Sequence, residues 1–242
     1  MLYLYNTTFK KTMKYLKAIW DIVFPKKCII CRREGQHLCE DCLSLIPINP
    51  FEYCLCEKME KRNKCDNCKN RNLDKILSAT SFNNKVVKEA IHKLKYGYIE
   101  DLSLPLAWLV LNHLKIINCE IDNTFILIPV PMHIKKKRKR GFNQSEKIAK
   151  IISETTGIKL STVLIKTKET KPQMELNRKE RIENIKNCFV ITDKKEIKNR
   201  PILLLDDVYT TGSTMDECAK ILKENGAKEV WGLSIAREIK LG

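Results

Sequence analysis

The stretch ILLLDDVYTTGST, which runs from Ile202 to Thr214, decides the fold of this 242-residue chain. Its apolar first half predicts a strand buried on both faces, which is typical of parallel sheets. Two adjacent carboxylates, Asp206 and Asp207, follow at the carboxyl end of that strand. Because ligands bind at this edge of open α/β sheets, the two acids are predicted to line a binding site.

A loop of hydroxyls and one glycine follows the acids and opens a predicted helix. It consists of Thr210, Thr211, Gly212, Ser213 and Thr214. Its backbone N–H groups, together with the positive end of the helix, suit a phosphate, and carboxylates accept hydrogen bonds from sugar hydroxyls. The stretch therefore predicts a sugar-phosphate site. One alternative is the Mg²⁺-holding strand of a P-loop NTPase, but no G-x-x-x-x-G-K-[ST] occurs in the sequence; the other is a plain turn with solvated acids.

The charge balance favours an anionic partner. The chain carries 45 Lys and Arg against 29 Asp and Glu, a formal net charge of +16, which indicates phosphate or nucleic acid as partner unless it is only a solvated basic surface. The longest apolar run, LSLPLAWLVL from Leu102, is shorter than the ~20 residues that a membrane-spanning helix needs. No signal-peptide core follows the start of the chain, so we expect a cytoplasmic protein without membrane insertion.

Eight of the eleven cysteines fall before residue 69, in four close pairs. They are Cys28 and Cys31, Cys39 and Cys42, Cys54 and Cys56, and Cys65 and Cys68. Two thiolates on a tight turn supply half of a tetrahedral zinc site, so the four pairs predict two structural zinc ions. Sequential pairing of the pairs makes a double zinc ribbon, and an interleaved cross-brace is the alternative. Disulfides are not expected in a cytosolic chain.

After residue 72 the pattern changes to alternating strands and helices. Helices are predicted at 83–97, 102–115, 144–157 and 213–227, and strands at 124–131, 161–166, 188–192, 201–207 and 228–236, with a polar stretch at 167–186. This alternation predicts an α/β domain with a mainly parallel, doubly wound sheet. The predicted domains are 1–72, an amino-terminal helix with the cysteine-rich segment, and 73–242.

The stretch that opens this section resembles the phosphoribosyl pyrophosphate (PRPP) motif of type I phosphoribosyltransferases. Two further stretches, LIPVPMHIKKKRKRGFNQSEKIA at 127–149 and KETKPQMELNRKERIENIKNCF at 168–189, resemble signatures of the ComF family. That family joins a cysteine-rich zinc domain to a phosphoribosyltransferase-like domain. The resemblance extends over almost the whole chain from Cys28.

The resemblance implies a role for each motif. Asp206 and Asp207 would hold the ribose hydroxyls as catalytic residues, and 210–214 would hold the 5′-phosphate. Lys136, Arg138, Arg140 and Gly141 would form the pyrophosphate loop, with Mg²⁺ bridging the pyrophosphate oxygens. A mobile loop at 168–181, with Arg178 as a catalytic residue, would close over the site.

Two functions follow from these motifs. The first is a PRPP-binding, phosphoribosyltransferase-like protein that acts in DNA uptake during natural transformation, with an unknown acceptor and with catalytic turnover left open. The alternative is a non-catalytic competence factor that keeps the fold and binds single-stranded DNA. The basic strip 135–140 with Phe142 and nearby His133 would then bind the phosphate backbone and stack a base. The DNA-uptake machinery is an expected partner in both cases. We do not expect an amidophosphoribosyltransferase, because nothing in the sequence corresponds to a glutaminase domain and the start MLYLYN offers no cysteine nucleophile.

Overall fold

A computed structural model describes residues 25–56, 65, 68–170 and 178–238, so the predicted amino-terminal helix lies outside the described residues. Contacts divide the chain into two units, Met1–Leu45 and Ile46–Gly242. The second cysteine cluster thus belongs to the same unit as the sheet. The domain boundary after residue 72 stays a prediction from the change of sequence class.

In the first unit, a short turn presents the first two cysteines. The Cys28 N–H donates to the Arg33 carbonyl at 2.8 Å, and the Arg32 N–H donates to the Cys28 carbonyl at 3.0 Å. The one-turn helix α2 (Glu40–Ser44) begins directly after Cys39. These hydrogen bonds hold the first cysteine pair on a tight turn, and the Leu43 N–H, which donates to the Cys39 carbonyl at 2.9 Å, holds the second.

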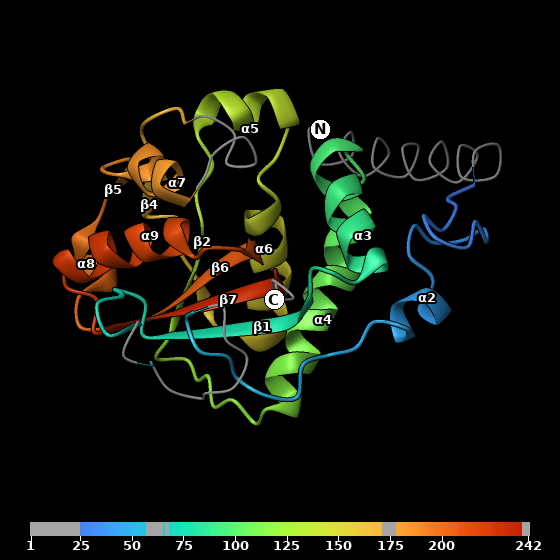
Figure 1. The fold of residues 1–242 in the computed structure, drawn as a ribbon, viewed down its shortest axis with the longest axis horizontal. Coiled ribbons are helices and arrows are strands. Elements are labelled where there is room, and N and C mark those ends of the chain that lie inside the picture. Colours follow the sequence, from blue (N-terminus) through green and yellow to red (C-terminus); the bar gives the residue numbers. More distant parts are fainter. Residues whose placement is uncertain (1–24, 57–64, 66–67, 171–177, 239–242) are drawn as a thin grey trace, which may run out of the picture. The chain divides into compact units, whose positions relative to one another are not determined.

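The second unit is built on a five-stranded parallel sheet, which confirms the predicted fold class (Figure 1). Its order is β1 (Lys75–Ser81), β7 (Glu229–Arg237), β6 (Pro201–Tyr209), β2 (Ile126–Pro129) and β3 (Lys159–Leu160). Each neighbouring pair is parallel. The first five residues of β6 are buried, as expected for a strand covered on both faces.

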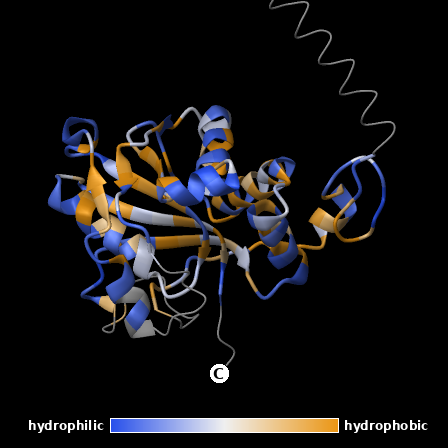
Figure 2. Cartoon of the chain, turned by 90° about the horizontal axis from the view of Figure 1, so that it is seen from above, coloured by the Kyte–Doolittle hydropathy of each residue, from blue (hydrophilic) through white to orange (hydrophobic). Residues whose placement is uncertain are grey.

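Helices cover both faces of this sheet. Helices α4 (Ser103–Ile116) and α6 (Gln144–Thr156) contact each other and one face, and α9 (Ser213–Glu224) packs on β6 and β7 from the other face. Helix α3 (Lys85–Tyr96) and the 3₁₀ turn η2 (Glu100–Leu102) precede α4. Figure 2 shows the apolar residues gathered in the strands and the helix faces that meet them. The layers therefore follow the α/β/α plan of doubly wound sheets.

Several elements differ from the predicted ones. The strands β4 (Leu164–Lys166) and β5 (Phe189–Ile191) form a separate antiparallel pair, not part of the main sheet. The polar stretch 167–186, for which no helix was predicted, contains helix α7 (Arg178–Ile185). The sequence patterns did not predict β1, β3 or the short helix α8 (Lys194–Ile197). The elements β3 and α8 carry too few residues for a clear periodicity, whereas in β1 the polar residues Ser78 and Thr80 are buried and interrupt the apolar pattern.

The basic run is also a helix and not a loop. Helix α5 (Ile134–Arg140) contains the six consecutive cations and ends at Gly141, whose φ of +87° is left-handed. Lysine and arginine are good helix formers, and a left-handed glycine is a common helix stop. The helix distributes the six side chains around its axis, so they do not form one continuous strip.

Among the described residues, no helix combines the length and the apolar character that a bilayer crossing requires.

Candidate functional site

The candidate site lies where the chain leaves two neighbouring parallel strands in opposite directions. From β6 the chain passes through α9 to β7, and from β2 it passes through α5 and α6 to β3 on the other side. Figure 1 shows α9 and α6 on opposite faces of the sheet. The Val130 N–H, just beyond β2, donates to the Leu205 carbonyl of β6 at 2.8 Å. Such a switch point forms a crevice at the carboxyl ends of the strands.

Asp206 and Asp207 lie at this crevice in two different environments. Asp207 is only 4% exposed. It accepts hydrogen bonds from Lys95 Nζ at 2.7 Å and from Gln144 Nε2 at 2.5 Å. Asp206 is partly exposed, and its Oδ1 accepts from Ser145 Oγ at 3.1 Å and from the Asp207 N–H at 2.9 Å. Asp207 is therefore held by the protein, whereas Asp206 is the acid that is more accessible to a ligand.

The electrostatic setting of Asp206 is unusual for a carboxyl group. Burial of its carboxylate, and then the neighbouring charge of Asp207, raise its pKa to about 7, against the opposing effect of Lys95. Ligand hydroxyls that donate to this carboxylate would favour its charged form. Binding of a ligand that donates hydrogen bonds to Asp206 would therefore lower the pKa of this carboxyl group.

The predicted phosphate cup lies beside Asp206. Gly212 has a φ of +72°, and α9 begins at the next residue, Ser213. Thr211 Oγ1 and Ser213 Oγ lie 2.8 Å apart. A small pocket is lined by Asp206, Val208, Tyr209, Thr210, Gly212, Ser213, Thr214 and Met215. The pocket thus contains all but one of the predicted phosphate-binding residues, together with Asp206 and the amino terminus of a three-turn helix.

Cations from three elements surround the acids. Lys95 comes from the end of α3, Arg140 is buried and donates to Gln144 Oε1 at 2.6 Å, and Lys166 ends β4. Although Lys136 is exposed as a residue, partial burial of its ammonium, followed by Arg140, Lys95 and Lys166, lowers its pKa. Burial likewise lowers the pKa of Lys166. Four cations around two carboxylates leave an excess of positive charge, which suits a polyanion.

The other predicted residues of the basic run lie elsewhere. Arg138 is exposed on α5, and Gly141 serves as the helix stop. Lys137 pairs with Glu146 at 2.6 Å and Lys135 with Glu169 at 2.9 Å. Four residues were predicted to bind pyrophosphate, and of these Lys136 and Arg140 lie near the acids. They are one helical turn apart on α5, so their side chains lie on the same side of the helix.

Two predicted residues of the loop and the DNA strip need separate comment. Arg178 is the first residue of α7, and its side chain lies outside the described structure, as do residues 171–177 of the predicted mobile loop. Phe142 is only 4% exposed. The prediction that Phe142 stacks on a base is therefore wrong, because its ring packs in the core.

Residues 99–231, more than half of the chain, match the family described as phosphoribosyl transferase domain. The chain belongs to this family. Competence protein F of Haemophilus influenzae is 29% identical over 227 residues, which cover 88% of this chain and 98% of that protein. Competence protein ComFC of Streptococcus pneumoniae is 29% identical over 213 residues, 86% of this chain and 91% of that protein. These relatives confirm the resemblance to the ComF family. The family match, together with the parallel sheet, confirms the type I phosphoribosyltransferase fold.

A third relative covers a smaller part. DNA utilization protein YhgH of Escherichia coli is 31% identical over 150 residues, 59% of this chain and 64% of that protein.

The sequence analysis did not identify four side chains of this site. They are Lys95, Gln144, Ser145 and Lys166. The polar triplet Asn143-Gln144-Ser145 at the start of α6 could have indicated two of them, because polar side chains that become buried need hydrogen-bond partners. Lys95 and Lys166 gave no such signal, because each is one lysine among many in a basic chain.

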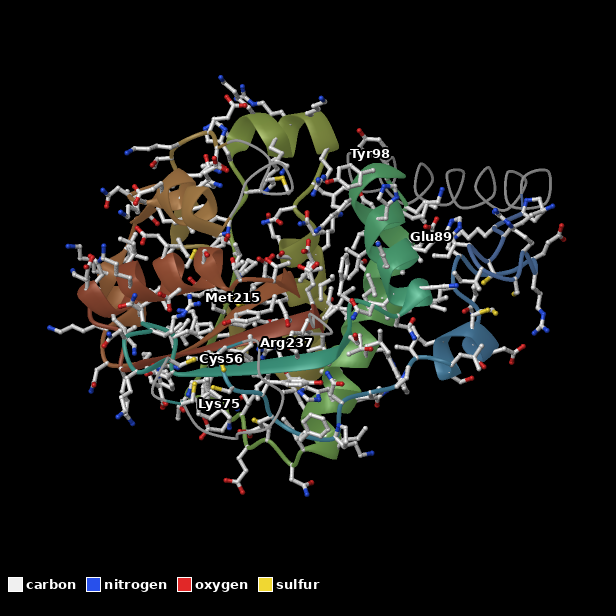
Figure 3. All side chains as sticks on the ribbon, viewed as in Figure 1. Cys56, Lys75, Glu89, Tyr98, Met215 and Arg237 are labelled. Carbon is white, nitrogen blue, oxygen red and sulfur yellow. The ribbon has the colours of Figure 1, made fainter. Side chains whose placement is uncertain are left out.

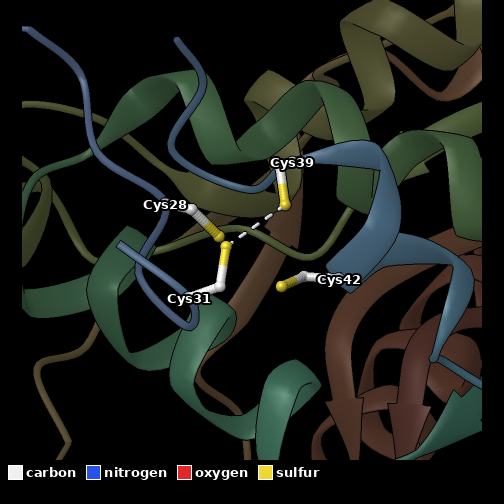
Figure 4. Close-up of side chains that lie close together, drawn as sticks. All are labelled: Cys28, Cys31, Cys39 and Cys42. Atoms are coloured by element: carbon white, nitrogen blue, oxygen red, sulfur yellow. Dashed lines mark hydrogen bonds between the residues drawn. The ribbon is translucent and has the colours of Figure 1, made fainter. Parts of the chain in front are cut away.

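Two clusters of four cysteines are placed as candidate metal centres among the described residues. They are Cys28, Cys31, Cys39 and Cys42, and Cys54, Cys56, Cys65 and Cys68, with the sulfur atoms of each cluster within 4.8 Å of one another. Figure 4 shows the first cluster, in which the Cys31 and Cys39 sulfurs lie 3.5 Å apart. The sulfur separations in the second are 3.5 and 3.7 Å.

These separations fit zinc. Four sulfurs at about 2.3 Å from a tetrahedral ion lie about 3.8 Å from one another, whereas a disulfide needs about 2.05 Å. None of the eleven cysteines, all of which lie in the described residues, forms a disulfide. The clusters therefore follow the sequential pairing of the double ribbon, and not the interleaved cross-brace.

We predict about two zinc ions per chain for purified protein, one in each cluster. Elemental analysis by plasma mass spectrometry measures this number directly. Replacing one ligand in either cluster, as in Cys31→Ser or Cys56→Ser, is expected to lower the content by about one. A wild-type content of one, unchanged by Cys56→Ser, would contradict a metal in the second cluster.

The raised pKa of Asp206 predicts a pH dependence of stability. The folded protein binds more protons than the unfolded chain between the ordinary value of about 4 and about 7. The free energy of unfolding should therefore contain a contribution that falls as the pH rises through this window. Asp206→Asn, which stays neutral, is expected to lack that fall and to be the more stable protein at pH 8. Urea unfolding at pH 5 and pH 8 checks this, and parallel pH profiles of the two proteins would contradict it.

Proposed function

We propose that this chain binds PRPP with Mg²⁺ at the crevice between β2 and β6, as a phosphoribosyltransferase-like protein that acts in DNA uptake. One observation carries the proposal. A phosphate cup, an accessible carboxylate and an excess of cations meet at a single sheet edge. PRPP offers a matching series of groups, namely a 5′-phosphate, sugar hydroxyls and a pyrophosphate.

Each part of the ligand has a matching group. The backbone N–H groups and hydroxyls of 210–214 suit the 5′-phosphate, and Asp206 suits the ribose hydroxyls, with Asp207 behind it. Lys136 and Lys95 are the cations that suit the pyrophosphate, and Mg²⁺ would bridge its oxygens and offset its charge. Arg178 and the segment 168–181 remain proposed as the cover of the site.

A chemical step at this site would transfer the phosphoribosyl group to an acceptor. The bond between ribose C1 and the pyrophosphate oxygen would break, and the acceptor would supply the electron pair for the new bond. Positive charge at Lys95, Lys136 and Arg140 would stabilise the departing pyrophosphate. The proposal leaves the acceptor open.

Calorimetry with PRPP and Mg²⁺ tests the binding, and ribose 5-phosphate is the matched comparison ligand. We expect PRPP to bind more tightly, since ribose 5-phosphate lacks the groups for the cation cluster. Incubation with a panel of bases and amines, followed by detection of pyrophosphate, tests turnover. An absence of PRPP binding would overturn the proposed function, whereas binding without turnover would support a non-catalytic role.

A second candidate function, binding of single-stranded DNA, is favoured by two exposed aromatic rings near the cations. Tyr96 is 51% exposed and Tyr98 is 57% exposed at the end of α3, where Figure 3 labels Tyr98. The Arg140 guanidinium lies 5.2 Å from the Tyr96 ring centre. Aromatic faces beside a basic surface are typical of proteins that stack bases and contact the phosphate backbone. The names of the relatives, competence and DNA utilization proteins, support the same role.

Removing both rings with Tyr96→Ala and Tyr98→Ala is expected to weaken single-stranded DNA binding by at least tenfold, since each stacked base contributes about 1–3 kcal/mol. Replacing the exposed Arg138 and Lys139 by Ala should flatten the salt slope by about 1.4, at about 0.7 for each phosphate. Fluorescence anisotropy over a salt titration measures both effects. Trp108→Ala, which removes an exposed aromatic from α4, is the control. Equal affinities of all three variants would place DNA binding elsewhere.

A further inference from the structure

The second cysteine cluster is tied to the phosphate cup by hydrogen bonds at both ends. Leu55 lies between Cys54 and Cys56, and its carbonyl accepts a hydrogen bond from Tyr209 Oη at 2.8 Å. Tyr209 is buried and directly precedes the cup in sequence. The Cys54–Cys56 turn therefore holds the side chain of Tyr209, the residue directly before the cup.

The chain after Cys68 holds the other end of the cup. Arg71 Nη2 donates to the Thr211 carbonyl at 3.1 Å. The backbone N–H groups of Asn72 and Leu73 both donate to Asp216 Oδ1, at 2.9 and 3.2 Å. Asp216 lies in the first turn of α9, so the chain that leaves the cluster braces both the cup and the helix start.

A buried guanidinium completes the link between the cluster and the sheet. Arg237, at the end of β7, is 2% exposed and donates to the carbonyls of Cys54, at 2.7 Å, and Cys56. Figure 3 shows Cys56 and Arg237 near each other. In the part of the chain that the structure describes, no carboxylate forms a salt bridge with Arg237. Four thiolates around Zn²⁺ keep two negative charges in excess, which would compensate this buried cation.

Close packing between Tyr209 and Gly212 connects the cysteine cluster to the backbone of the cup. A Cβ placed on Gly212 would lie 2.3 Å from Tyr209 Oη and 2.4 Å from its Cζ. Only a glycine fits against the ring at this distance. The position of the Tyr209 ring, set by the Leu55 carbonyl, therefore determines where the Gly212 backbone lies.

We infer that the second cysteine cluster, when its thiolates hold zinc, positions the phosphate cup, and that Tyr209 and Arg71 are the positioning residues. Tyr209 also lines the pocket at the cup, but its hydroxyl donates to the Leu55 carbonyl, so it acts by positioning the cup. The inference rests on the proposed function for the nature of the ligand. It separates the two clusters by role, since the first belongs to the other unit and only the second carries these hydrogen bonds to the cup among the described residues.

A matched pair of variants tests the inference. Cys56→Ser and Cys31→Ser each remove one ligand, from the second and the first cluster respectively, and zinc content is measured in both. Hydrogen exchange of the peptide covering 210–216 reports the order of the cup without any ligand. We expect exchange to rise at least tenfold in Cys56→Ser and to stay unchanged in Cys31→Ser. Equal exchange in the two variants would overturn the inference.

Tyr209→Phe keeps all eight thiolates, and it remains informative if Cys56→Ser fails to fold. We expect full zinc content, faster exchange in the cup, and a dissociation constant for ribose 5-phosphate about fivefold higher, from the loss of one hydrogen bond. Unchanged exchange in this variant would overturn the inference. If wild-type protein binds neither ribose 5-phosphate nor PRPP, the proposed function fails, while the exchange data still decide whether the cluster orders the loop.

Discussion

Replacing Asp206 by Asn is expected to weaken binding of PRPP with Mg²⁺ by about a hundredfold. Hydrogen bonds to a charged group contribute about 1.5–3 kcal/mol each, and a ribose offers two hydroxyls to this carboxylate. The fold should survive, because an Asn side-chain oxygen can still accept from Ser145 Oγ and from the Asp207 N–H. Calorimetry on the two proteins measures the change in affinity.

Asp207→Asn is the informative companion to this substitution. Asp207 is buried and accepts from Lys95 Nζ and Gln144 Nε2. Removing its charge leaves Lys95 without its counter-ion, so this variant should lose stability as well as affinity. Urea unfolding separates the two effects. An unchanged PRPP affinity in Asp206→Asn would show that this acid does not hold the sugar.

Gly212→Ala is expected to have the second large effect, a destabilisation of about 3 kcal/mol with loss of ribose 5-phosphate binding. Left-handed backbone costs a residue with a Cβ about 1–2 kcal/mol, and overpacking costs about 1–3 kcal/mol. Both apply here, because φ is +72° and the new Cβ would overlap the Tyr209 ring. Urea unfolding and calorimetry measure the two losses.

Gly141→Ala is the matched control for this prediction. Gly141 also has a positive φ, +87°, but a Cβ there would meet nothing within 4 Å. It should therefore show only the backbone cost. If both variants lose the same free energy of unfolding, then the contact between Gly212 and Tyr209 contributes nothing.

The sequence by itself determined the features that a short segment can encode. The acids and the cup come from one strand, turn and helix, so their order along the chain already places them together. The paired cysteines likewise determined two candidate metal centres, because each C-x-x-C or C-x-C turn brings its own two sulfurs together. Residues 201–214 and 28–68 could therefore be assigned to these sites before any fold was known.

The tertiary structure alone decided the contacts between distant segments. Lys95 pairs with Asp207 across 112 residues of sequence, and Tyr209 donates to Leu55 across 154. It also decided that the basic run is a helix, which turns Lys136 and Arg140 toward the acids and leaves Arg138 exposed. The physical reason is that side-chain pattern reports local conformation, whereas the partner of a buried charge depends on which strand ends and helix ends the packed sheet brings side by side.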